Sequence, residues 1–356
     1  MIERSFLSSF WFSLLGIAKT ILKNFIYKLT RYEFWPWYCI YLPLLPVYFF
    51  GVLRTRRLLY FTATNPSIDM GGFFGEHKDE ILDLIPNRHK AVGVHITEPM
   101  TEKELNEVLL ANNLRFPVVA KPNVGERGDG VCVLYLMHEL LAYGQEETDY
   151  IVQEYIDYPI ELGVLFYRYP NDTGGRVSSI TRKEFLSVKG NGTHTVEQLL
   201  SQSGRSKIYL PMVRKEFQDR LLLVPPEGEE FVVHKIGNHS KGTRFINADA
   251  YITGALNATF SEINNQVDGV YFGRYDLKVP SFDHLERGED IKIFELNGVS
   301  SEPGSMYDQQ NVLKAYSMLA HHWLALVEIS YQNIKRGVET TPLRVFFRKV
   351  RHHFYG

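Results

Sequence analysis

The first 57 residues carry two apolar patterns. Apolar side chains recur every three or four positions between residues 6 and 29, which is the period of one helix face: Phe6, Phe10, Leu14, Ala18, Ile21, Leu22, Phe25 and Leu29. Residues 34–53 then run for 20 positions without a charge, about the length that a helix needs to cross a bilayer.

Two features argue against a simple span through residues 34–53. Pro36, Pro43 and Pro46 interrupt helical hydrogen bonding, and Lys and Arg flank the segment on both sides. We therefore expect a re-entrant or interfacial hairpin with both ends on the cytoplasmic side, although a true span stays open. Aromatic residues would anchor the hairpin at headgroup depth: Trp35, Trp37, Tyr38 and Tyr41. A signal peptide is not expected, because the apolar run begins late and no small-residue cleavage site follows it.

The rest of the chain alternates strand and helix patterns. Strands are predicted over residues 58–64, 116–122, 130–136, 150–156, 160–170, 175–185, 269–279 and 290–297. A Gly-rich turn after residue 64 leads into a helix near residue 78. Further helices are predicted over residues 101–113, with Thr101 and Glu104 as a capping box, and over 195–203, 213–222, 248–266 and 308–334. Mostly antiparallel strands with helices on one side describe an α+β body.

Charge is distributed unevenly between the N-terminal segment and the rest of the chain. The chain is 45% hydrophobic and 22% charged, which argues against wholesale disorder and a polytopic transporter. Residues 1–57 carry eight Lys/Arg against two Glu, whereas the remainder carries 31 basic and 39 acidic residues. This split indicates a basic, membrane- or polyanion-facing end joined to an acidic body.

The C-terminal tail is basic and aromatic as well: Arg344, Phe346, Phe347, Arg348, Lys349, Arg351, Phe354 and Tyr355. Membrane attachment is the preferred interpretation of both ends. Packing of the ends against the body, or an oligomer contact, stays open as the alternative. Cys39 and Cys132 provide neither a disulfide framework nor metal-ligand spacing, so reducing, cytosolic surroundings are expected.

A glycine-rich hairpin is the first candidate for chemistry. Lys121 lies at the end of the predicted strand 116–122, and Gly125, Gly128 and Gly130 follow it before the next strand. Backbone N–H groups of such a hairpin can close over phosphate oxygens while the lysine supplies charge. The segment is not a Walker A loop, since no Gly-Lys-Ser/Thr follows at the required spacing. An ordinary structural hairpin remains the alternative.

A set of oxygen ligands is the second candidate. Glu295 and Asn297 point to one face of the strand 290–297, because strand side chains alternate, and a neighbouring strand could bring Asp276 alongside. Three hard oxygen donors suit Mg²⁺ that is shared with nucleotide phosphates. The alternative is that the carboxylates face solvent and Asn297-Gly298 is only a turn.

The order of these motifs resembles the ATP-grasp superfamily of carboxylate–amine ligases, D-alanine–D-alanine ligase in particular. The resemblance covers residues 76–310 and runs through Lys121, the glycine hairpin, YIVQEYI, GRYD, and ELN followed by Pro303-Gly304. GNGTHTVEQLL (190–200) and GNHSKGT (237–243) are similar to stretches in the ATP-grasp part of cyanophycin synthetase and related glutamate–cysteine ligases. Residues 58–90 are too short for the usual N-terminal substrate domain, so the resemblance does not identify the substrates.

The resemblance implies two α+β subdomains that grip ATP. Lys121, with Lys78 as a second lysine, would contact the phosphates beneath the lid glycines Gly125, Gly128 and Gly130. The implied organisation is a membrane-associating segment (1–57), a strand–turn–helix lead-in (58–90), an ATP-grasp domain (91–330) with its lid at about 91–155, and a C-terminal tail (331–356).

The resemblance also implies roles around the base, the sugar and the metal. Glu154 would lie at the adenine hinge, where the backbone of Tyr155 and Ile156 would pair with the base, and Glu161 would take the ribose hydroxyls. The expected metal ligands are Asp276, Glu295 and Asn297, with Mg²⁺ as the metal and Mn²⁺ as an alternative. Arg274 would stabilise an acyl phosphate and the tetrahedral species formed from it.

The leading hypothesis is therefore an ATP- and Mg²⁺-dependent ligase that joins a carboxylate to an amine at the cytoplasmic side of a membrane. At least one substrate is expected to be lipid-linked or envelope-related, and nucleic acid is not expected among the partners. A nucleotide-binding regulatory or scaffold protein without turnover is the alternative from another class, and a kinase or phosphate transferase without an amine acceptor is a third. The sequence leaves the oligomeric state open.

Overall fold

The computed structural model describes residues 27–28, 30–125, 128–202, 204–309 and 311–355, with side chains as far as residue 352 in the last helix. The amphipathic helix predicted between residues 6 and 29 lies almost entirely outside the described residues. The described chain forms two compact units. Unit 1 comprises the chain up to Leu44 together with Leu186–His234, and unit 2 comprises Leu45–Phe185 with Lys235–Gly356.

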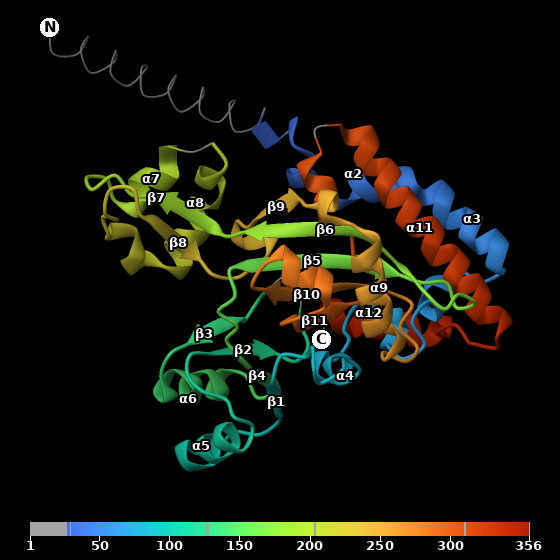
Figure 1. The fold of residues 1–356 in the computed structure, drawn as a ribbon, viewed down its shortest axis with the longest axis horizontal. Coiled ribbons are helices and arrows are strands. Elements are labelled where there is room, and N and C mark those ends of the chain that lie inside the picture. Colours follow the sequence, from blue (N-terminus) through green and yellow to red (C-terminus); the bar gives the residue numbers. More distant parts are fainter. Residues whose placement is uncertain (1–26, 29, 126–127, 203, 310, 356) are drawn as a thin grey trace, which may run out of the picture. The chain divides into compact units, whose positions relative to one another are not determined.

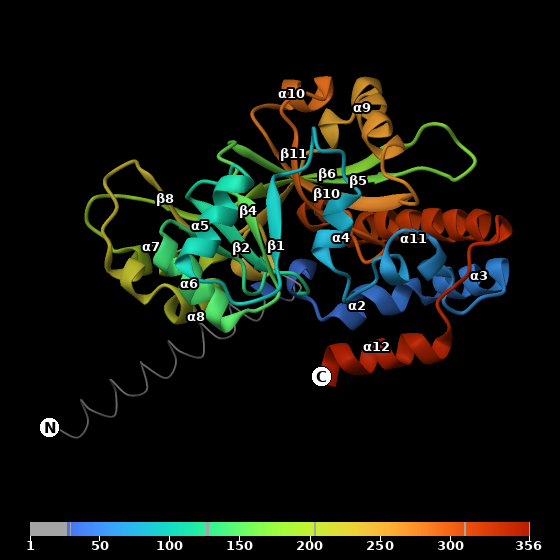
Figure 2. The ribbon, with the colours of Figure 1, turned by 90° about the horizontal axis from the view of Figure 1, so that it is seen from below.

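Unit 2 is built around a five-stranded antiparallel sheet in the order β11-β10-β5-β6-β9 (Figure 1). Its strands are β5 (Ile160–Tyr167), β6 (Arg176–Glu184), β9 (Arg244–Asn247), β10 (Phe272–Val279) and β11 (Lys292–Asn297). One face of the sheet packs with α9 (Gly254–Asn265), α10 (Phe282–Arg287) and α4 (Lys78–Asp83) in a large apolar core. Figure 2 shows α9 and α10 on one side of this sheet and α11 (Val312–Lys335) on the other.

A second, four-stranded antiparallel sheet lies in the same unit, in the order β1-β4-β2-β3. Its strands are β1 (Gly93–Ile96), β2 (Val118–Pro122), β3 (Cys132–Leu134) and β4 (Tyr150–Glu154). The helices α5 (Glu102–Ala111) and α6 (Met137–Glu146) share its core, in which Leu105 and Leu140 pack with Val118 and Val152. The predicted capping box of α5 is confirmed, because Thr101 and Glu104 bond reciprocally.

The remaining helices of unit 2 are two α-helices and several short 3-10 helices. They are α3 (Leu45–Thr55) and α12 (Leu343–Tyr355), with the short 3-10 helices η3 (Tyr60–Ala63), η4 (Asp69–Gly71), η6 (His239–Lys241), η7 (Asp249–Tyr251) and η8 (Gly304–Asp308). α3 packs against α11. Gly51 of α3 makes room for the ring of Tyr60 in η3, because a Cβ there would lie 2.5 Å from that ring. Among the described residues, one helical stretch, Trp37–Thr55, is long and apolar enough to cross a membrane.

Unit 1 combines an insertion with the chain before Leu44. It contains the hairpin of β7 (Leu186–Lys189) and β8 (Glu230–His234), α7 (Val196–Gln202), α8 (Ser206–Glu216), η5 (Gln218–Leu222), η1 (Tyr32–Phe34), α2 (Trp37–Tyr41) and η2 (Leu42–Leu44). Phe34 packs on this core, with its ring centroid 6.4 Å from that of Tyr209. Glu33 and Arg205 form an ion pair at 3.7 Å. Glu33 and Phe34 therefore have protein partners within their own unit.

The seven strand predictions between residues 116 and 297 are confirmed, and so is the mixed helix and antiparallel-sheet class. The expected placement of helices on one side is wrong for the five-stranded sheet, because α11 lies on the side opposite α9 and α10. The strand predicted over residues 58–64 is wrong, because Tyr60–Ala63 forms a 3-10 helix whose carbonyls meet a side chain of α11. Asn333 Nδ2 donates to the carbonyls of Ala63 and Thr64 at 2.9 and 3.0 Å. The helix predicted over 213–222 is two elements, α8 and η5, and residues 248–253 precede α9 because Thr253 caps it.

Candidate functional site

A charged face lies on the five-stranded sheet of unit 2, opposite its apolar core. The antiparallel register pairs Lys278 with Glu161 and Glu161 with Lys183 across three strands. The next row on the same face pairs Glu295 with Asp276, and Asp276 with Gly163. Tyr275 and Leu277 alternate with these residues and are buried in the core. We call this set, with Arg274 and Asn297 in the following row, the charged face.

Asp276 is the centre of the charged face and is almost fully buried. Arg274 donates to both of its oxygens, from Nε at 2.7 Å and from Nη2 at 3.1 Å, and Lys183 Nζ donates to Oδ2 at 3.2 Å. Burial would raise the pKa of Asp276, but the two cations hold it below its ordinary value. Gly163 makes this arrangement possible, since a Cβ there would lie 3.1 Å from Asp276 Oδ1 and from Arg274 Cδ.

Glu161 is held by two lysines. Its carboxylate pairs with Lys183 Nζ at 3.3 Å and with Lys278 Nζ at 3.9 Å, and all three side chains are largely withdrawn from solvent. The backbone at Gly237 lies directly against it, because a Cβ there would come 1.8 Å from Glu161 Oε1. The predicted contact of Glu161 with a ribose stays a prediction.

Lys121 reaches the charged face from the four-stranded sheet. It lies at the end of β2, and its Nζ donates to the Phe294 carbonyl of β11 at 2.8 Å and to Gln153 Oε1 at 3.1 Å. Burial lowers the pKa of Lys121 to about 8, against the opposing influence of Glu295. A buried lysine with a depressed pKa is stabilised by any anion that enters beside it.

Lys78 lies at the base of the glycine hairpin. It is the first residue of α4, and its Nζ donates to the Gly125 carbonyl at 2.7 Å and to the Pro122 carbonyl at 3.2 Å. Gly128 and Gly130 have φ angles of 71° and 69°, a backbone region that disfavours other residues. The hairpin between β2 and β3 is therefore confirmed, with residues 126–127 outside the described part of the chain.

The predicted adenine hinge is the connection between the two sheets. β4 ends at Glu154 and β5 begins at Ile160, so Tyr155 and Ile156 lie in the linking segment. Glu154 Oε1 accepts from Val92 N–H at 2.8 Å and pairs with Lys292 Nζ at 2.7 Å. Lys278 Nζ donates to the Ile156 carbonyl at 3.0 Å and lies 5.3 Å from the ring centroid of Tyr155.

The predicted metal ligands lie together as the strand alternation indicated. Asn297 pairs with Arg274 in the register, one row beyond Glu295 and Asp276. Asn297 Nδ2 is buried without a hydrogen-bond partner, and within the described ranges the Glu295 carboxylate forms no hydrogen bond or ion pair. These oxygen donors are of the type that a divalent cation prefers. No group of three His, Cys, Asp or Glu side chains in the described chain has a metal-holding arrangement, so a metal would need Asn297 or phosphate oxygens as well.

Comparison with known proteins gives distant structural similarity only. No protein-family model matches this chain, and no curated protein matches it. Solved structures similar to it include D-alanine–D-alanine ligase from Bacillus anthracis (12% identity, TM-score 0.40) and VanG D-Ala:D-Ser ligase from Enterococcus faecalis (14%, 0.40). A third is a bifunctional glutathione synthetase from Pasteurella multocida (14%, 0.35). All three are ATP-grasp enzymes.

These similarities cover 73%, 70% and 70% of this chain, respectively. The chain spans 67% of the first ligase, 61% of the second and 38% of the glutathione synthetase. The superfamily that the sequence resembles is thus found again among the structural neighbours. TM-scores this low assign no activity, so the functional proposal rests on the residues of the charged face.

Two lysines of the charged face were not among the predicted site residues. Lys183 and Lys278 each bond a carboxylate of this face, and Lys183 bonds both Glu161 and Asp276. The alternation of side chains along a strand could have placed Lys278 on this face, since it lies two residues after Asp276 in β10. Lys183 could not be paired from the sequence, because its partners lie 22 and 93 residues away.

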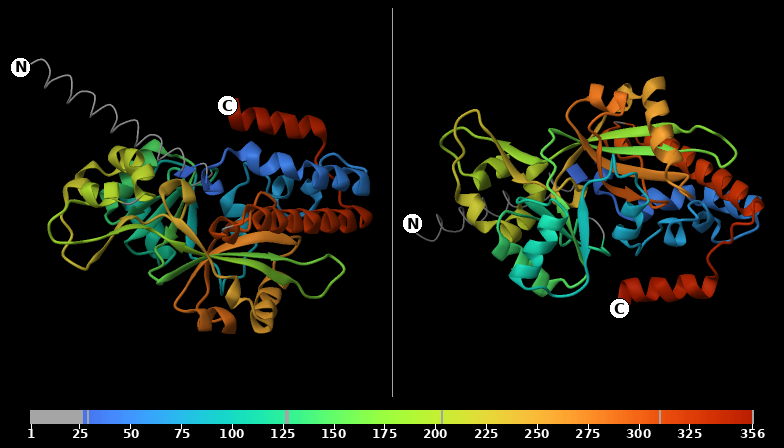
Figure 3. Two further views of the ribbon diagram at one scale, coloured as in Figure 1. Left: turned by 90° about the horizontal axis from the view of Figure 1, so that it is seen from above. Right: turned by 60° about the horizontal axis from the view of Figure 1, so that its bottom comes forward.

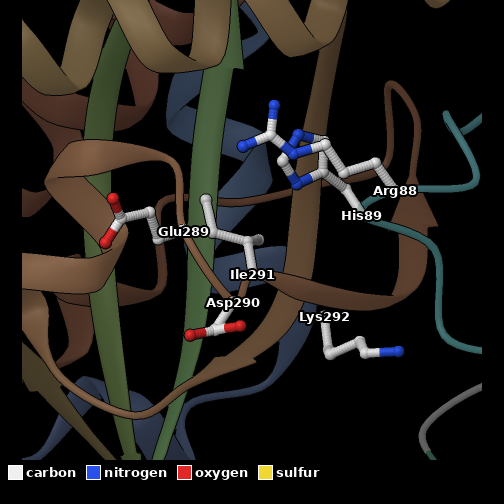
Figure 4. Close-up of a pocket in the computed structure, with 6 residues that line it drawn as sticks. All are labelled: Arg88, His89, Glu289, Asp290, Ile291 and Lys292. Atoms are coloured by element: carbon white, nitrogen blue, oxygen red, sulfur yellow. The ribbon is translucent and has the colours of Figure 1, made fainter.

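A separate surface pocket lies where residues 88–89 run beside the start of β11 (Figure 4). It is lined by Arg88, His89, Glu289, Asp290, Ile291 and Lys292. In Figure 4 the two acidic side chains point away from Arg88 and His89, and Glu289 pairs with Arg287 at 2.8 Å. Because these groups do not converge, the pocket contributes no reactive set.

Proposed function

We propose that this chain is an ATP- and Mg²⁺-dependent carboxylate–amine ligase that forms an amide through an acyl phosphate. The observation that carries the proposal is the contact of Lys121 with the strand β11, which bears part of the charged face. A buried lysine from one sheet contacts β11 of the other beside Glu295, while Asp276 and Arg274 lie in the neighbouring strand. Phosphate binding, metal binding and oxyanion stabilisation all have a side chain within this small region.

The nucleotide phosphates would lie between the glycine hairpin and Lys121. Lys78 and Lys121 supply positive charge, and the glycines let backbone N–H groups approach the phosphate oxygens. Glu154, Tyr155 and Ile156 would line the adenine position at the linking segment, with Glu161 near the ribose. Lys278 already holds the Ile156 carbonyl and would fix the path of this segment.

The metal would be held by Glu295 and Asn297, with Asp276 as the third ligand. It would neutralise charge on the β- and γ-phosphates, and Mg²⁺ suits these oxygen donors, with Mn²⁺ as an alternative. Asp276 can join the set if Arg274 or Lys183 turns toward phosphate, since each cation gains an anionic partner by that movement.

The reaction takes two balanced steps. A substrate carboxylate oxygen attacks the γ-phosphorus of ATP, and the bond from the γ-phosphorus to the β-γ bridging oxygen breaks. The products of this step are ADP and an acyl phosphate. An amine then attacks the acyl carbon, loses a proton, and expels inorganic phosphate to give the amide. Arg274 carries a guanidinium at the sheet surface, bonded to Asp276, and on turning toward the substrate it would stabilise the oxyanion of the tetrahedral species.

Turnover with pooled carboxylates and amines tests the proposal, with Arg274→Lys as the probe. Arg287→Lys is a matched control, because Arg287 also pairs with a carboxylate two residues away but is exposed outside the site. We expect ADP release by the wild type to require Mg²⁺, and Arg274→Lys to lower kcat on the order of 100-fold, as for loss of an oxyanion donor. Equal ADP release by Arg274→Lys and the wild type would contradict the proposal. Mg-ATP binding without any ADP release would support the non-catalytic alternative.

The proposed location is the cytoplasmic surface of a membrane, with a lipid-linked substrate among those it uses. Support comes from the exposed apolar residues of α3, in which Leu53 is 79% exposed and Phe49 56%. Leu53→Asp should release the full chain from the membrane fraction, whereas Leu313→Asp, at a similarly exposed site of α11, should not. Wild-type protein that is wholly soluble would contradict this location.

A further inference from the structure

The C-terminal helix α12 has an apolar face that the rest of unit 2 covers only at one edge. Its apolar residues recur at helical spacing, namely Leu343, Phe346, Phe347 and Val350. Phe347 is 64% exposed and Leu343 is 47% exposed, so most of this face meets solvent. Figure 2 shows α12 as the outermost helix of its unit, beyond α11 and α3, and Figure 3 shows the same position from the opposite side.

The covered edge of α12 packs on three phenylalanine rings of unit 2, Phe61, Phe73 and Phe74, which we call the aromatic seat. Phe346 packs on Phe61, Phe73 and Phe74, with ring centroids 6.3, 6.0 and 6.0 Å away. Lys349 contacts Asp69 at the far end of the same surface. Among the residues whose side chains the structure describes, Phe346 makes the ring contacts of α12 with the body and Lys349 its ion pair, while Val345 and Val350 are half-buried.

The exposed polar side of α12 is uniformly basic. Arg344, Arg348 and Arg351 recur at the i, i+4 and i+7 positions beside the apolar face, and all three are exposed. None of them forms an ion pair with a described residue, and no Asp or Glu occurs after Glu339. Unpaired arginines along the edge of an exposed apolar face are typical of helices that lie in the interface of an anionic bilayer.

We propose that α12 docks unit 2 onto an anionic lipid surface, with Leu343, Phe347 and Val350 inserted and the three arginines at the phosphate level. The occupant is a bilayer with negatively charged headgroups, because the helix offers positive charge together with an apolar face. This contact is separate from the apolar attachment proposed for α3, which has no requirement for headgroup charge.

Docking through α12 would bring lipid to the segment that follows the candidate metal ligands. Phe73 follows Gly72, whose carbonyl accepts from Ser300 N–H at 3.1 Å, and Gly71 accepts from Val299 N–H at 3.1 Å. The aromatic seat is thus bonded to residues 299–300, two positions beyond Asn297. This consequence rests on the proposed function, and it favours a substrate whose reacting group is carried by a membrane lipid.

Hydrogen exchange of the full chain with lipid vesicles tests the docking. We expect phosphatidylglycerol-containing vesicles, but not pure phosphatidylcholine vesicles, to slow exchange in residues 343–352. Arg348→Gln should lower vesicle affinity on the order of fivefold, and Phe347→Asp should lower it further. The matched controls are Lys103→Gln and Leu313→Asp, which change equally exposed residues elsewhere in unit 2.

Unchanged exchange in residues 343–352 with anionic vesicles would overturn the proposal, even if the protein still binds lipid through α3. Protection that needs no lipid and rises with protein concentration would also overturn it, since a second copy would then cover the face. Anionic protection of α12 in a protein that never hydrolyses ATP would support the docking and refute the proposed function, so the two failures are distinguishable.

Discussion

Lys121 gives a quantitative prediction, because its burial opposes folding at neutral pH. The residue is 6% exposed, and its pKa falls from 10.5 to about 8. Below pH 8 the group is charged in both the folded and the unfolded chain, so the burial cost is fully present. Between pH 8 and 10.5 the unfolded chain binds the extra proton, so stability rises with pH. At 1.36 kcal/mol per pKa unit, the rise amounts to about 3 kcal/mol.

Lys121→Met removes the titrating group while keeping an unbranched side chain. The loss of hydrogen bonds to Phe294 and Gln153 offsets part of the relief at pH 7, about 1 kcal/mol for each bond. The sign of the stability difference between the two proteins at pH 7 is therefore not diagnostic. The diagnostic quantity is the change of that stability difference with pH, since every other titrating group is common to both proteins.

Urea unfolding of both proteins between pH 7.5 and 10.5 measures this slope. We expect the wild type to gain about 3 kcal/mol relative to Lys121→Met across that range. Parallel stability curves would refute the assignment of Lys121 as a buried, perturbed lysine. Titration of ATP at pH 9 in two buffers of different ionisation enthalpy adds a functional readout, because phosphate beside Lys121 should cause proton uptake in the wild type alone.

Three further changes test other parts of the structure. His322 is buried, which lowers its pKa to about 4. Between pH 6.5 and 4 the unfolded chain therefore binds one more proton than the folded chain, so the free energy of unfolding falls by about 3 kcal/mol as the pH falls. His322→Gln should lose this pH dependence in thermal melts. Gly163→Ala should crowd the pair of Asp276 and Arg274, weakening Mg-ATP binding in calorimetry, whereas Gly254→Ala has open space and should leave binding unchanged. Thr101→Ala removes the cap of α5 and should lower the unfolding free energy by about 1 kcal/mol in urea titration.

The strands that carry the candidate site were predictable from local pattern. The two-residue alternation correctly grouped Glu295 with Asn297, and the register then paired Asp276 with Glu295 as expected. The glycine hairpin after Lys121 was equally local, since β2 and β3 pair directly across it. The juxtaposition of these residues is confirmed, while the roles given to them stay predictions.

The rest depended on contacts between distant parts of the chain. Residues 58–64 have the composition of a strand, but the carbonyls of Ala63 and Thr64 accept hydrogen bonds from Asn333, which lies 270 residues after Ala63. Glu33 pairs with Arg205, which lies in an insertion far along the chain, so no local pattern could pair them. Lys183 bonds two carboxylates on different strands, so its position followed from sheet order, which no local pattern contains.

The most direct test of the central claim is calorimetric titration of a non-hydrolysable ATP analogue with and without Mg²⁺, in the wild type and in Glu295→Gln. Glu295 forms no ion pair in the described chain but favours the charged form of Lys121, so the melting temperature of each protein is measured beside its binding. Glu184→Gln, a change at a half-exposed residue that ends β6, is the control. We predict that Mg²⁺ tightens binding to the wild type and the control, and that Glu295→Gln loses on the order of tenfold in Mg²⁺-dependent affinity. Equal affinity in all proteins, or binding indifferent to Mg²⁺, would contradict the account.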